Sequence, residues 1–143
     1  MLRIGAILLS LWTGLNLALA LGILFMMLLM GKNAPCLLIL YGATQGAGMD
    51  PRALATINGL AVLLNACAAA ICGLSLAVIW MALRRASRWA FWSLLICLTF
   101  LQVAGFASDS FFQHKNLVAN IGSSLLLLAG TGCAAVGVFR KIR

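Results

Sequence analysis

The stretch "GKNAPCLLILYGATQGAGMDPRA", Gly31 to Ala53, decides how many times this chain crosses a membrane. It lies between two long apolar segments and contains an apolar run of its own, Cys36 to Tyr41. As a helix that run would extend only about 9 Å, because each residue adds ~1.5 Å. Three glycines then interrupt any extension, and "MDPRA" has the Asp-Pro pattern of a helix start. The sequence therefore predicts an interfacial or re-entrant segment over about residues 32–49, and not a fifth crossing.

Most of the remaining chain is apolar and long enough to span a bilayer. Of the 143 residues, 64% are hydrophobic and 8% are charged, which is too few charges for a water-soluble surface. A hydrocarbon core of about 30 Å needs about 20 helical residues. Four segments satisfy this requirement: residues 4–30, 53–83, 89–108 and 117–139. They lack the polar stripes that a soluble helical bundle shows on its outer faces.

These segments predict one all-α membrane domain over residues 1–143, with four transmembrane helices in an up-down-up-down bundle. The first segment exceeds the ~7–15 apolar residues of a signal peptide core, so we expect it to be retained as a span.

The basic residues are divided unevenly between the two sets of helix ends. One set has seven: Arg3, Arg84, Arg85, Arg88, Arg140, Lys141 and Arg143. The other has Lys32, Arg52 and Lys115, with Asp50 and Asp109. By the positive-inside rule, both termini and the "RRASR" loop are expected in the cytoplasm, at a plasma membrane of the bacterial inner-membrane type.

The same charges indicate which partners to expect. Basic residues at cytoplasmic helix ends attract anionic lipid headgroups. We therefore expect Arg84, Arg85 and Arg88 to contact lipid or a partner protein. No basic patch lies outside these flanks, so the net charge of +8 does not indicate a nucleic-acid partner.

Small and weakly polar residues recur at helical spacing in three of the four segments, which in lipid is the pattern of a helix contact. We call each such series a seam. The first segment has Ser10, Gly14, Ala18 and Gly22; the second has Asn58, Ala61, Asn65, Ala68, Cys72 and Ser75; the fourth has Asn116, Asn120, Ser123, Gly130, Ala134 and Gly137, with Leu127 between. The third has a weaker series, Ser93, Cys97, Leu101 and Ala104.

Amide side chains lie inside the apolar segments and need partners, because an unpaired amide in hydrocarbon is costly. One interpretation is hydrogen bonding between helices. The other is a polar, outward-facing ligand pocket lined by Asn58, Asn65, Gln102 and Asn120, with Asp109 and His114 at its mouth.

The chemistry of most membrane enzymes and coupled transporters is missing from this sequence. No segment has an ionisable acid or base in its interior, where proton-coupled transporters carry one. The closest cysteines, Cys67 and Cys72, do not form the Cys-x-x-Cys pair of thiol oxidoreductases. A hydrolytic site of Asp109, His114 and a nearby serine stays open, although no glycine-flanked nucleophile turn accompanies it. We predict no catalytic residue, no metal site and no cofactor. The state of Cys36, free or joined to a second chain, is left open.

Two functions remain. The first is helix association, either with a second copy or as an accessory subunit of a larger membrane-protein complex. The alternative is binding or transport of a small neutral or weakly polar solute through the amide pocket.

Overall fold

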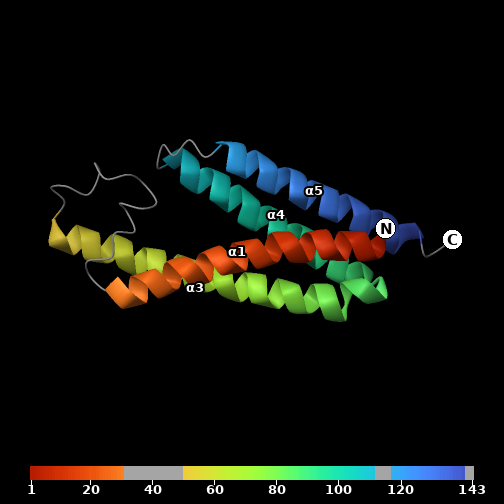
Figure 1. The fold of residues 1–143 in the computed structure, drawn as a ribbon, viewed down its shortest axis with the longest axis horizontal. Coiled ribbons are helices and arrows are strands. Elements are labelled where there is room, and N and C mark those ends of the chain that lie inside the picture. The colour runs from red at the N-terminus through yellow and green to blue at the C-terminus, as the bar shows by residue number, and fades with distance from the viewer. Residues whose placement is uncertain (31–49, 112–116, 141–143) are drawn as a thin grey trace. The chain divides into compact units, whose positions relative to one another are not determined.

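The structure is a computed structural model that describes residues 1–30, 50–111 and 117–140, and for residues 108–111 and 117 it describes the backbone alone. Its helices are α1 (Leu2–Met30), α3 (Pro51–Met81), α4 (Arg88–Phe111) and α5 (Leu117–Arg140), with a short 3-10 helix, η2 (Leu83–Arg85), after α3 (Figure 1). The predicted re-entrant segment at residues 32–49, Cys36 and His114 lie outside the described residues.

All four α-helices are long and apolar enough to cross a membrane. The two shortest have 24 residues each. At ~1.5 Å per residue they measure about 36 Å, which exceeds the ~30 Å of a hydrocarbon core. The prediction of an all-α chain with four helices of membrane-spanning length is therefore confirmed.

The exposed faces of these helices are apolar, as are the faces that pack against other helices. In the most apolar stretch of each helix, only 17% to 22% of the residues are buried. Large side chains such as Ile96, Phe100 and Leu128 are 69%, 75% and 66% exposed. An apolar surface of this extent is unfavourable in water and favourable in lipid.

The chain divides into two compact units, residues 1–15 with 71–143, and residues 16–70. The first, unit 1, contains the start of α1, the end of α3, η2, α4 and α5. Its core is formed by large buried side chains, among them Leu9, Trp12, Ile79, Leu83, Leu94, Leu98 and Val138. The second, unit 2, contains the end of α1 and the start of α3. There Met27, 3% exposed, packs with Ile23, Ala61 and Val62.

In unit 1, α1 and α5 are in backbone contact and run in opposite directions. A Cβ placed on Gly5 would lie 2.8 Å from Ala134 Cα and 2.9 Å from Gly130 O, and one on Gly137 would lie 2.6 Å from Leu2 N. Contacts this short are possible only because these residues are glycines. The two helices therefore approach each other as closely as small residues allow in membrane proteins.

The contacting face of α1 differs from the seam that the sequence predicted. Described contacts to α5 come from Leu2, Gly5, Leu9 and Trp12. By contrast, a Cβ on Gly14 or Gly22 would meet no described atom within 4 Å. Within unit 1, Gly14 of the predicted series is thus not part of the α5 contact.

A tight turn joins α3 to α4. Ala86 has a φ of 61°, the only positive value at a described non-glycine residue, and its N–H donates to Leu83 O at 2.8 Å. This left-handed residue ends η2 in the manner of a helix C-cap. Because Leu83 is fully buried, the turn is anchored in the core and holds its arginines at the end of unit 1.

Candidate functional site

A chain of side-chain hydrogen bonds links α1, α4 and α5 within unit 1. Trp12 Nε1–H donates to Ser123 Oγ at 2.8 Å, and Ser123 Oγ donates to Gln102 Oε1 at 2.9 Å. Gln102 Nε2 in turn donates to Ser124 Oγ at 3.0 Å. Ser124 Oγ closes the chain by donating to Asn120 O at 2.8 Å. We call these five residues the polar network.

The network satisfies its own donors and acceptors. Each serine hydroxyl accepts one hydrogen bond and donates another, and the Gln102 amide uses both its oxygen and its nitrogen. Trp12 is only 2% exposed, so its indole N–H needs an acceptor inside the protein. Since all five side chains are uncharged, the network can fix helix positions but has no proton to release near neutral pH.

The predicted pocket residues are distributed between the two units. Gln102 and Asn120 belong to unit 1 and are close, with Gln102 Nε2 at 3.5 Å from Asn120 O. Asn58 and Asn65 belong to unit 2. His114 and the side chain of Asp109 lie outside the part of the chain that the structure describes.

The two asparagines of unit 2 differ in how their amides are satisfied. Asn65 Nδ2 donates to Ala61 O of its own helix at 2.8 Å. Asn58 is 7% exposed, and its amide oxygen and nitrogen have no hydrogen-bond partner among the described residues. A buried amide without partners costs about 1–3 kcal/mol or more, which a bound water or polar ligand would offset.

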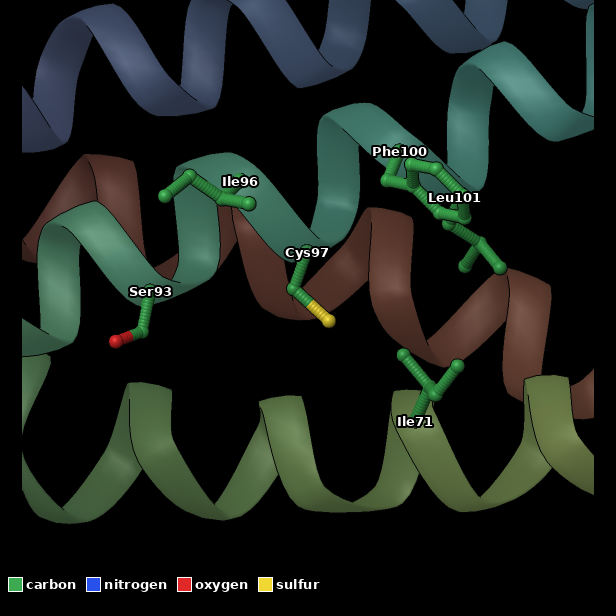
Figure 2. A pocket seen from close by; sticks show the side chains of 6 residues that line it. All are labelled: Ile71, Ser93, Ile96, Cys97, Phe100 and Leu101. Carbon is green, nitrogen blue, oxygen red and sulfur yellow. The ribbon is translucent and has the colours of Figure 1, made fainter.

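An apolar pocket lies between α3 and α4 in unit 1. It has a volume of about 540 Å³ and is lined by Ile71, Ser93, Ile96, Cys97, Phe100 and Leu101. In Figure 2, Ser93 and Cys97 from α4 and Ile71 from α3 point into the space between the two helices. One hydroxyl and one thiol among four apolar side chains suit an apolar or weakly polar occupant such as a lipid chain.

The arginines of the α3–α4 turn, for which the sequence predicts lipid or partner contacts, are exposed in the structure. The Arg84 guanidinium carbon lies 4.6 Å from the centroid of the Trp80 ring, and that of Arg88 lies 6.0 Å from the centroid of Phe139. Both distances are in the range of cation–π contacts.

Thiols and metal ligands form no recognisable centre in the described part of the chain. Cys67, Cys72, Cys97 and Cys133 are all free thiols. No group of three histidine, cysteine, aspartate or glutamate residues is close enough there to hold a metal ion.

The sequence identified Gln102 as a candidate site residue but missed three of its network partners, Trp12, Ser123 and Ser124. Ser123 was assigned to the α5 seam, and Trp12 and Ser124 were assigned no role. The adjacent serines were the available signal, because a hydroxyl pair in an apolar helix needs partners just as an amide does. Comparison of the chain with protein-family models, with curated proteins and with solved structures found no match.

Proposed function

We propose that this chain is a small polytopic inner-membrane protein that acts through helix association, with a second copy or as an accessory subunit of a larger membrane assembly, and without catalysis of its own. The observation that carries the proposal is the polar network. Gln102, the amide of unit 1 best suited to hold a ligand, is instead bonded to two serines of a neighbouring helix. Its role there is packing.

The arrangement we propose is the up-down-up-down bundle, with both termini and the α3–α4 turn in the cytoplasm. It is supported by the charge distribution, since the arginines of the turn and Arg140 lie at helix ends and outside the apolar interiors. Within unit 1, the opposite directions of α1 and α5 agree with it. The exposed guanidinium groups of the turn would then contact anionic headgroups or a partner.

A surface for association is available on the outside of α5. Gly122, Leu125, Ala129 and Gly132 are exposed and follow the three-four spacing of a helix contact. A Cβ on Gly122 or Gly132 would meet no described atom within 4 Å. These four residues, the outer seam, lie apart from the glycines that α5 presents to α1. A partner helix could approach the backbone here as α1 does on the inner side.

The outer seam gives a direct test. Gly132→Leu adds bulk where the chain itself has space, so we expect the single chain to fold normally and its association to be lost. The matched control is Gly105→Leu on α4, because Gly105 is also open. The mass of the assembly is measured by light scattering in a mild detergent, with the co-purifying chains identified. Association that is absent in the wild type, or that survives Gly132→Leu unchanged, would contradict the proposal.

A second candidate function is favoured by Asn58. Its amide is buried and has no described partner, as expected of a group that holds a water or a small polar solute. Under this alternative the chain binds or transports a small neutral or weakly polar solute through an outward-facing crevice. Asn65, two turns further along α3, would be reached from the same crevice.

Thiol labelling distinguishes this alternative. In a chain whose own cysteines are replaced, Asn65→Cys is compared with Leu64→Cys, whose side chain is 68% exposed and faces outward in an apolar surface. A water-filled crevice predicts that an impermeant maleimide added outside labels residue 65 and leaves residue 64 unlabelled. Protection of both positions would eliminate the crevice, leaving Asn58 as an unsatisfied packing residue.

A further inference from the structure

A basic cavity lies at one end of unit 1, where the start of α1, the α3–α4 turn and the end of α5 meet. Its volume is about 640 Å³, within the ~300–1,000 Å³ of small-ligand pockets. It is lined by Met1, Leu2, Arg3, Arg84, Val136, Gly137 and Arg140. Three arginines from three separate elements therefore border one cavity, which we call the arginine niche.

The fold brings these arginines together through contacts that other residues make. Gly137 allows the backbone of Leu2 to rest on the last turns of α5, which places Arg3 beside the helix that ends at Arg140. Leu83, fully buried, anchors the 3-10 helix η2 that carries Arg84. The ring of Trp80, 4.6 Å from the Arg84 guanidinium carbon, further restricts that side chain. The fold thus restricts these residues before a ligand binds, which reduces the conformational entropy lost on binding.

The described residues that line the niche include no acidic side chain to balance its arginines. The whole sequence has ten lysines and arginines and only two acidic residues. Like charges that converge without a counterion repel each other, so the niche is more stable with an anion bound.

The number of arginines, and the separate elements that carry them, indicate which anion fits. A guanidinium group presents a planar fork of N–H donors that suits carboxylate and phosphate oxygens. A carboxylate has two oxygens in one plane, whereas a phosphate presents oxygens in tetrahedral directions. Arginines carried by three separate elements can contact more of the phosphate oxygens than of the two carboxylate oxygens. We propose that the arginine niche binds a phosphate group, carried either by an anionic lipid headgroup or by a small phosphate in solution.

The test uses the purified full-length chain in detergent micelles. Phosphatidylglycerol or phosphatidylcholine is titrated in, and bound lipids are counted by native mass spectrometry. Inorganic phosphate is titrated separately by calorimetry. Preferential binding of phosphatidylglycerol without phosphate binding assigns the niche to a headgroup. Binding of phosphate without a lipid preference assigns it to a soluble anion. Absence of both would overturn the proposal.

Matched variants separate a built site from general surface charge. Arg84→Gln is expected to weaken binding about fivefold, from the usual contribution of a basic residue near a headgroup. Arg85→Gln, next to it in η2 but outside the niche, removes one general headgroup contact and is expected to weaken binding clearly less than Arg84→Gln. Equal losses in the two variants would overturn the proposal.

A lysine variant keeps the charge that orients the chain in the membrane. Replacing Arg3, Arg84 and Arg140 together by lysine removes only the forked donors, so we expect about a threefold loss or more. Unchanged binding in that variant would show a general charge effect and would also overturn the site. None of these measurements depends on helix association, so the proposed function can fail without affecting this result.

Discussion

Gly5→Ala is expected to lower the free energy of unfolding by about 1–3 kcal/mol, the usual cost of overpacking a close contact. The added Cβ would lie 2.8 Å from Ala134 Cα and 2.9 Å from Gly130 O. Both neighbours are backbone atoms, so no rotamer change relieves the contact. The helices α1 and α5 would have to separate, which would also strain the bond from Trp12 to Ser123.

The control is the same substitution further along the same helix. A Cβ on Gly14 would meet no described atom within 4 Å, so Gly14→Ala adds no clash. Alanine is the better helix former, by up to ~1 kcal/mol, and this variant is expected to be as stable as the wild type or more stable. Unfolding is followed in mixed micelles with increasing dodecyl sulfate. If Gly5→Ala matched Gly14→Ala, the α1–α5 contact would not exist as described.

The opposite signs expected for these variants show what holds unit 1 together. Lipid is as apolar as leucine, so burial of apolar surface contributes little to helix association in a membrane. Close backbone packing and interhelical hydrogen bonds remain, and both occur along the α1–α5 contact. The polar network then connects this pair to α4 through Gln102.

The sequence predicted the packing faces of α3 and α5 well, because polar residues mark them. Along α3, all six residues of the predicted seam are buried or half-buried, including Asn58, Cys72 and Ser75. Along α5, Gly130 and Ala134 are buried against α1, and Ser123 belongs to the polar network. A polar side chain is unfavourable in lipid, and a very small one allows close helix contact, so residues of both kinds indicate the face that packs against another helix.

The faces of α1 and α4 could not be predicted in the same way. On α4, Ala90, Leu94 and Leu98 are buried, whereas Ser93 of the predicted series is exposed. Other large apolar residues of this helix, such as Ile96 and Phe100, are exposed, so an apolar residue does not reveal its direction. On α1, small residues occur on more than one face. The residues that contact α5 include both the small Gly5 and the large Trp12.

The candidate site was predictable in part. Gln102 stands out in the sequence because an amide in an apolar helix must find a partner. Its actual partners depend on the relative depth and rotation of α4 and α5, which no single-helix pattern encodes. Ser123 and Ser124 therefore emerge only when the two helices are placed side by side.

The loops on opposite sides of the membrane are expected to differ completely in labelling, because an impermeant reagent reaches only one side. Four crossings place the α3–α4 turn and the C-terminal end on one side, and the segment between α4 and α5 on the other. Three single-cysteine variants report these positions in a chain without its own cysteines: Ser87→Cys in the turn, Gln113→Cys between α4 and α5, and Lys141→Cys after α5. The physical reason is the excess of arginine and lysine at the first and third positions.

Whether lipid surrounds four crossings with both ends in the cytoplasm is measured by treating intact bacterial cells with an impermeant maleimide before and after permeabilisation. We expect Gln113→Cys to be labelled on intact cells, and Ser87→Cys and Lys141→Cys to be labelled only after permeabilisation. Labelling of Ser87→Cys on intact cells would contradict this topology. Labelling of Lys141→Cys but not Ser87→Cys on intact cells, or the reverse, would also contradict it, because the two positions would then lie on opposite sides.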